Sequence, residues 1–163
     1  MSNVLQRNRS LSELEFYANA IRIRIEITQL MSRERVVPKR YRLLLAAPTI
    51  ATAKAMIDNI ATAESFYRNS AHGVIWRKHY LTLAIGNCYS LAQDIQVLKD
   101  SGIGAVNLDA FKDVADMLER EIALLRGVKK STRLNGKGDI AERIAMARAQ
   151  VAELEELQAM ELG

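Results

Sequence analysis

Residues 111–125, FKDVADMLEREIALL, hold the most regular pattern of apolar residues in this chain of 163 residues. Intervals of three and four positions separate the apolar residues Phe111, Val114, Leu118, Ile122 and Leu125. An α-helix has about 3.6 residues per turn, so this spacing puts all five on one helical face. The stretch predicts an amphipathic helix that begins at a cap, Asn107 or Asp109, and continues to about residue 128.

The rest of the chain also favours helix. Ala, Leu, Ile, Glu, Arg and Lys dominate, and there are only two prolines and eight glycines. Helical spacing predicts three further long helices, over residues 10–32, 38–69 and 74–101. Four long helices with short connections predict an all-α fold, an antiparallel up-and-down four-helix bundle. An additional helix follows at the C-terminus.

The apolar faces of the first three helices are predicted from the same spacing. IRIRIEI at 21–27 alternates like a strand, but its flanks keep helical spacing. Pro48 lies inside the second helix and is expected to kink or divide it. Residues 68–73, which include His72, are expected to form a turn. The predicted core positions are Leu14, Tyr17, Ala18, Ile21, Ile25 and Met31 (with Ile23 and Ile27 widening this face), then Tyr41, Leu44, Leu45, Thr52, Met56, Ile60, Ala63 and Tyr67, then Trp76, Tyr80, Leu83, Ala84, Asn87, Leu91, Ile95 and Leu98.

Beyond the bundle, predicted as residues 1–128, the composition changes. RGVKKSTRLNGKG at 126–138 has five bases, three glycines and no acid, which is typical of a flexible linker, assigned to 129–138. Residues 139–163 predict a helix, with Asp139 and Glu142 at the spacing of a capping box. Its narrow apolar seam is typical of packing against another helix and comprises Ile140, Ile144, Ala147, Val151 and Leu154.

Charge divides the chain into a basic body and an acidic end. Residues 139–163 hold six acidic and two basic residues, a balance of −4 within a total of +4, so residues 1–138 carry +8. A positive body attracts polyanions such as nucleic acids.

Motifs for catalysis are missing from the sequence. It has no Gly-rich phosphate loop, no zinc-ligand spacing and no Glu-x-x-His pair. Its one cysteine, Cys88, is expected to be a small buried thiol. Asn87 is expected to specify the register of the helices or to bond a neighbouring helix, rather than to bind a ligand. We therefore expect a protein that is not an enzyme and has no catalytic residues, metal site or cofactor. The longest purely apolar run is LLLAAP at 43–48, so we expect a cytoplasmic protein with no membrane helix.

The basic residues fall in clusters along the chain. RERVVPKRYR at 33–42 has five bases and one acid. In an up-and-down bundle this loop lies at one end, and the bases around positions 77 and 130 lie at the other. These clusters predict two basic zones, or one basic side, that bind phosphates; the alternative is that they are solvated helix ends. The candidate nucleic-acid-binding residues are Arg33, Arg35, Lys39, Arg40, Arg42, Arg77, Lys78, Arg126, Lys129, Lys130 and Arg133. Tyr41, Trp76 and Tyr80 are expected in the core.

The motif VVPKRYR resembles a known family. An apolar residue followed by Pro-Lys, with an arginine three positions later, is similar to the four-helix-bundle family first described from intervening sequences in 23S ribosomal RNA genes. The matching positions are Val37, Pro38, Lys39 and Arg42. The resemblance covers about residues 10–128, through AMIDNIATAESFY and WRKHYLTLAIGNCYSLAQDIQVLKD. The family has a phenylalanine where this chain has Val37, and its compact members lack the fifth helix.

That family includes the accessory variability protein of diversity-generating retroelements. The resemblance implies a homo-oligomer, a homopentamer, that binds a reverse transcriptase and its RNA template or complementary DNA. The expected function is therefore a non-catalytic, nucleic-acid-binding accessory protein for reverse transcription. The alternative is a structural or adaptor bundle that binds a protein partner through the apolar edge of its first helix and the seam of its last.

Overall fold

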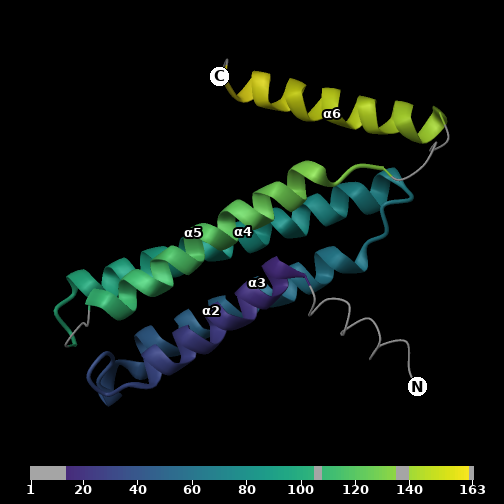
Figure 1. Ribbon diagram of the computed structural model, residues 1–163. Helices are drawn as coiled ribbons and strands as arrows, with labels where there is room; N and C mark the ends of the chain where they lie inside the picture. Colours follow the sequence, from purple (N-terminus) through teal and green to yellow (C-terminus); the bar gives the residue numbers. More distant parts are fainter. Residues whose placement is uncertain (1–13, 105–107, 135–139, 162–163) are drawn as a thin grey trace, which may run out of the picture.

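The computed structural model describes residues 14–104, 108–134 and 140–161 (Figure 1). This part of the chain is helical apart from its short connections and contains no strand, which confirms the predicted all-α class. The cap positions predicted at Asn107 and Asp139 lie outside the described residues. The elements in chain order are α2 (Glu15–Ser32), η1 (Lys39–Tyr41), η2 (Arg42–Ala46), α3 (Ala47–Ser65), α4 (Ala71–Asp100), α5 (Leu108–Ser131) and α6 (Ile140–Glu161).

The helices pack around one hydrophobic core. Helix α2 contacts α3 and α5, α3 contacts α4, and α4 contacts α5. Figure 1 shows α4 and α5 side by side along most of their length, and α6 lies beyond them, in contact with α4. The core is filled by side chains from all four of the helices α2 to α5.

The buried face of α2 differs from the predicted one. Ile23 and Ile27 are fully buried, whereas Ile21 is half-buried and Ile25 is exposed. Alternating isoleucines define two faces, because residues two positions apart on a helix point about 200° apart. Phe16, Ala20 and Leu30 decide between these faces, since they share the side of Ile23 and Ile27.

The second predicted helix comprises three elements. A 3-10 turn (η1) leads into a π-helical turn (η2), and the regular helix α3 begins at Ala47. Pro48 therefore lies in the first turn of α3, where the missing N–H costs least. The predicted division occurs there. Leu44 and Tyr67 were expected in the core but are exposed, because the π-turn changes the direction of the side chains before α3 and Tyr67 follows its end.

The helical stretch Lys39–Ser65 is long and apolar enough to cross a membrane, judged by length and composition alone. Its most apolar window has a mean hydropathy of 1.2, and 33% of that window is buried inside the protein. The buried residues Met56, Ile57 and Ile60 belong to the common core, and core helices of soluble proteins pass the same test.

Helix α4 begins earlier than predicted, at Ala71. The Ser70 hydroxyl accepts a hydrogen bond from the Gly73 N–H at 3.1 Å and so caps the helix. His72, predicted in a turn, is therefore in the first helical turn. Trp76 and Leu83, predicted in the core, are exposed. The buried face is rotated from the predicted one and comprises Val74, Leu81, Ala84, Ile85, Cys88, Leu91, Ile95 and Leu98.

Helix α5 confirms the opening stripe, since Phe111, Val114, Leu118 and Leu125 are buried and Ile122 is half-buried. The helix ends at Ser131, so residues 129–131, predicted in a flexible linker, are helical. The buried Thr132 ends the helix: its N–H and its hydroxyl both donate to the Val128 carbonyl, at 3.0 and 2.8 Å. The amino-acid composition does not predict this helix end, because the end depends on hydrogen bonds that Thr132 makes to the last turn of the helix.

Candidate nucleic-acid interface

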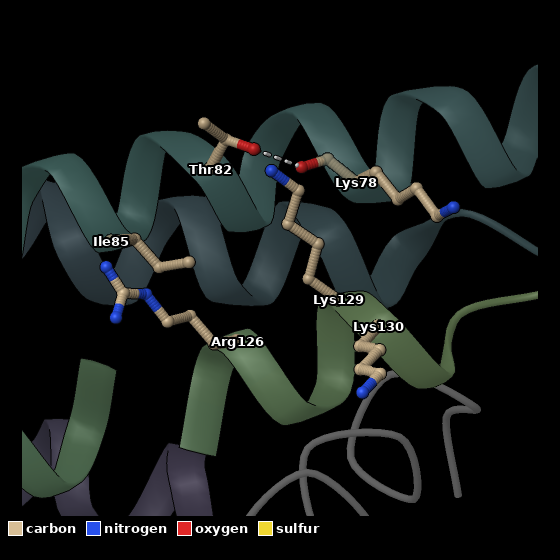
Figure 2. A pocket seen from close by; sticks show the side chains of 6 residues that line it. All are labelled: Lys78, Thr82, Ile85, Arg126, Lys129 and Lys130. Atoms are coloured by element: carbon tan, nitrogen blue, oxygen red, sulfur yellow. Dashed lines mark hydrogen bonds between the residues drawn. The ribbon is translucent and has the colours of Figure 1, made fainter. Parts of the chain in front are cut away.

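A basic hollow lies between α4 and α5 (Figure 2). Four of the six residues that line it carry a positive charge, and none carries a negative charge. Lys78 comes from α4, near the end at which α5 finishes. The others on α4 are Thr82 and Ile85, and α5 supplies Arg126, Lys129 and Lys130. We call these six residues the basic groove.

The local sequence explains why the charges meet. Arg126, Lys129 and Lys130 are three and four positions apart, so they share one face of α5. They occupy the last two turns, where positive charge interacts favourably with the helix dipole. The helix end at Thr132 holds these turns in regular form. Extension of α5 beyond its predicted end is therefore what brings its bases opposite Lys78.

The side chains in the groove point in different directions. Figure 2 shows Lys129 extended from α5 toward α4, and the Arg126 guanidinium close to Ile85. Lys130 points away from the other residues. The Thr82 hydroxyl donates to the Lys78 carbonyl at 2.8 Å, so its hydrogen is already used. The Lys78 side chain extends along α4, away from Lys129 in this view, so these two lysines bring positive charge to the hollow from two different helices.

Tyr89 extends the groove along α4 and was not singled out from the sequence. Its hydroxyl accepts a hydrogen bond from Arg126 Nη2 at 2.6 Å, and the guanidinium lies 6.0 Å from its ring centre. The ring is exposed, and exposed aromatic rings beside basic residues can stack on bases. The sequence does contain a pattern that indicates Tyr89. This residue follows Lys78 by eleven positions, about three helical turns, so both residues lie on one face of α4.

A second hollow adjoins the groove on the side of α6. It shares Lys78, Thr82 and Lys129 with the groove. Helix α6 contributes an acid to its lining, Glu153. The remaining lining residues are Val74, Ile75 and His79 from α4, and Met146, Ala149 and Gln150 from α6.

The other predicted zone, residues 33–42, is a tight corner. Arg42 Nη2 donates to the Ser32 carbonyl and to Glu34 Oε2, both at 3.0 Å. The Lys39 N–H donates to the other oxygen of Glu34 at 3.2 Å. Arg42 therefore closes the corner and is half-buried, while the side chain of Lys39 is exposed. The remaining bases of the corner are also exposed: Arg33, Arg35 and Arg40.

Arg77 is held inside the fold. It forms an ion pair with Glu64 of α3, and the two side chains are only 11% and 14% exposed. A buried pair is expensive to break, because one charge is then left without compensation. Arg77 thus serves to join α3 to α4, and we leave it out of the interface. Arg133 is exposed just beyond α5 and does not line the groove.

The core and its margin hold a buried thiol, Cys88, and a hydrogen-bonded pair of amides, Asn59 and Asn87. Burial, and to a smaller extent the charge of Glu121, raise the pKa of the Cys88 thiol to about 12. Such a thiol stays protonated and is a poor nucleophile. Asn59 Nδ2 donates to Asn87 Oδ1 at 2.8 Å, which confirms the predicted link from Asn87 to another helix. No group of three or more potential metal ligands occurs in the described part of the chain.

The aromatic residues near the start of α4 form a cluster. Phe66 stacks on Tyr80, with ring centres 5.7 Å apart, and Trp76 lies edge-on to His79 at 5.4 Å. Tyr80 packs against the core as predicted, whereas Trp76 lies at its exposed margin. Tyr41 also packs against the core, with the Arg40 guanidinium 4.7 Å from its ring centre.

No protein-family model and no curated protein sequence matches this chain. The resemblance to the four-helix-bundle family therefore stays a prediction from the residues quoted for it. The geometry adds one observation to that motif: Val37 is fully buried and Arg42 closes the corner. Two of the four motif residues thus have structural roles in this chain.

Proposed function

We propose that this chain is a non-catalytic accessory protein that binds nucleic acid through the basic groove. The observation that carries the proposal is the set of four bases in one hollow without an acid among its lining residues. Lys78 and Lys129 approach from two helices, and Tyr89 offers a ring beside Arg126. Phosphates bind such paired cations, and bases stack on such rings.

The scaffold that we propose is an antiparallel up-and-down four-helix bundle of α2 to α5. Each of these helices contacts the next, and α2 contacts α5, which closes the set. Consecutive helices also run back and forth in Figure 1. In this arrangement the start of α4 and the end of α5 share one end of the molecule. That common end is what positions Lys78 beside Lys129.

A reverse transcriptase as partner, in a diversity-generating retroelement, is the biological context that we propose. Its support is the resemblance of the motif Val37, Pro38, Lys39 and Arg42 to the four-helix-bundle family that includes the accessory variability proteins. A reverse-transcriptase gene and a repeat pair beside the gene for this chain would support that context. A gene neighbourhood without them would remove it and leave binding through the groove intact.

The groove is tested by removing two of its charges. We expect the double variant Lys78→Gln, Lys129→Gln to bind a fluorescent single-stranded RNA at least about tenfold more weakly than the wild type, because each lysine lost removes a phosphate contact. Fluorescence anisotropy at low salt measures this. The matched control is Lys99→Gln, Lys112→Gln, which removes the same charge from two exposed lysines outside the groove. Equal losses in both variants would refute a specific site.

An adaptor function is the second candidate, and an apolar hollow on α2 favours it. The hollow is lined by Ile21, which packs against the margin of the core, and by the exposed Ile25, together with Arg24, Thr28 and Gln29. If the chain is an adaptor, Ile21→Ser with Ile25→Ser abolishes binding to a purified partner while the groove variant leaves it unchanged. The adaptor function is rejected if the isoleucine variant still binds the partner and the groove variant does not.

A further inference from the structure

The corner between α2 and α3 exposes two neighbouring leucines among basic side chains. Leu43 is 84% exposed and Leu44 is 72% exposed, both on the π-turn η2. The exposed Ala47 and Pro48, four positions further along, continue this apolar surface. An exposed apolar patch with a polar rim is typical of an interaction site. We call this surface the leucine corner, and its rim consists of the exposed bases Arg33, Arg35, Lys39 and Arg40.

The charge of the leucine corner is positive. Residues 33–42 hold five bases and one acid. The acid, Glu34, is paired with Arg42 at 3.0 Å, and no other base of the corner forms an ion pair with a described residue. The neighbouring end of α4 adds Lys99 and Asp100, whose charges cancel. A partner at this corner therefore binds more tightly if it is anionic.

The bases and the leucines of the corner lie close together. Lys39 precedes Leu43 by four positions and Arg40 precedes Leu44 by four, so each pair spans about one turn of the helical elements η1 and η2. The Arg40 guanidinium lies 4.7 Å from the ring centre of Tyr41, and Tyr41 packs against the core. Figure 1 shows the corner at one end of the bundle, beyond the end of α2.

An anionic lipid bilayer satisfies both parts of this surface. Leucines gain from insertion at the level of the headgroups, and bases are attracted to anionic lipids. A nucleic acid would pair with the bases but leave the leucines in water, and the ring of Tyr41 already contacts Arg40 and the core. A stable protein interface buries about 800 Å² on each partner, far more than two leucine side chains offer.

We propose that the leucine corner docks on an anionic lipid bilayer, with Leu43 and Leu44 between the headgroups and the four rim bases on the lipid phosphates. Ala46 and Thr49 are buried, so the corner enters the bilayer and α3 does not cross it. The basic groove lies toward the other end of α4, a helix of 30 residues and about 45 Å. Docking of the corner therefore does not depend on nucleic-acid binding by the groove.

Sedimentation of the full chain with lipid vesicles tests this proposal. The wild type should sediment with vesicles of equimolar phosphatidylcholine and phosphatidylglycerol, and not with vesicles of phosphatidylcholine alone. We expect Leu43→Ser with Leu44→Ser to bind the anionic vesicles at least about tenfold more weakly, although its charge is unchanged. Arg35→Gln with Lys39→Gln should bind about 25-fold more weakly, because each base near an anionic surface contributes about fivefold.

Two control variants match these changes elsewhere in the chain. Leu83→Ser with Val97→Ser removes two exposed apolar side chains of α4. Lys78→Gln with Lys129→Gln removes two bases from the groove. Both variants should bind the anionic vesicles as the wild type does. Circular dichroism establishes that all four variants are folded.

Three results would overturn the proposal. The first is equal sedimentation with both kinds of vesicle, or equal binding of the anionic vesicles by the corner variants and the wild type. The second is a loss of RNA affinity in the corner variants without vesicle binding by the wild type, which would make the corner a nucleic-acid interface. The third is a change of mass in light scattering for the leucine variant, again without vesicle binding by the wild type, which would make the corner a contact between proteins.

Discussion

Glu121 is the residue whose position in the core has the clearest energetic consequence. It is fully buried on α5 and accepts a hydrogen bond from Asn19 at 2.8 Å, while Oε1 has no hydrogen-bond partner in the described structure. The pKa of Glu121 is raised from 4.5 to about 7. Burial is the largest cause; the Asn19 hydrogen bond opposes it, and the charge of Glu15 adds to it. The carboxyl group is thus stable in the core mainly when it is protonated.

This raised pKa predicts how stability varies with pH. The folded state binds the proton more tightly than the unfolded chain, so the proton's stabilisation is complete below about pH 4.5 and is lost as the pH rises to about 7. Between about pH 5 and pH 8 we expect the free energy of unfolding of the wild type to fall by about 2–3 kcal/mol because of Glu121. Glu121→Gln carries no charge at this position and should not show this decrease. Urea denaturation at both pH values measures this. The exposed Glu119→Gln is the control, and equal pH dependence in Glu121→Gln and wild type contradicts the explanation.

Gly104 is a second residue whose role can be tested alone. A Cβ at this position would lie 2.1 Å from the Val36 carbonyl oxygen and 2.7 Å from that of Arg35. We expect Gly104→Ala to destabilise the protein by about 1–3 kcal/mol, because backbone atoms must move apart. At Gly86, in α4, nothing lies within 4 Å, so Gly86→Ala should stabilise by up to about 1 kcal/mol. Thermal unfolding of both variants checks the contrast, and similar effects would contradict it.

At the scale of elements, α6 adds negative charge beside the basic groove. Glu153 lines the hollow that shares Lys78 and Lys129 with the groove. We expect Glu153→Gln to bind single-stranded RNA about two- to fivefold more tightly, because a nearby acid repels phosphates and competes for the lysines. Glu156→Gln, an acid of α6 outside the lining of that hollow, should have a smaller effect. Anisotropy titrations compare them, and unchanged affinity in Glu153→Gln would show that α6 leaves the groove unaffected.

The elements also show what the sequence predicts and what it does not. The face of α5 is predicted correctly, because only one set of positions there is apolar. In α2 the positions of Ile21 and Ile25 compete with those of Ile23 and Ile27, and helical spacing alone cannot choose. The end of α5 was missed because the chain after Val128 is polar and basic, and only the hydrogen bonds of Thr132 reveal a helix end.

At the scale of the whole molecule, the sequence predicts where the bases gather better than what each base does. The up-and-down order of helices placed Lys78 near Lys129, and the groove joins them. The same reasoning assigned Arg77 to the interface, although Glu64 holds it in a buried ion pair. Glu64 is thirteen positions away on another helix, so no local pattern in the sequence predicts this ion pair. Contacts between elements require the folded structure.

The central claim is that the basic groove binds the phosphates of a nucleic acid. The most direct measurement is the slope of log affinity against log salt concentration for a single-stranded RNA. Each phosphate contact contributes about 0.7 to this slope on single strands. We predict that Lys78→Gln with Lys129→Gln makes the slope shallower by about 1.4, while Lys99→Gln with Lys112→Gln leaves it unchanged. Parallel lines for the groove variant and the wild type would contradict the account.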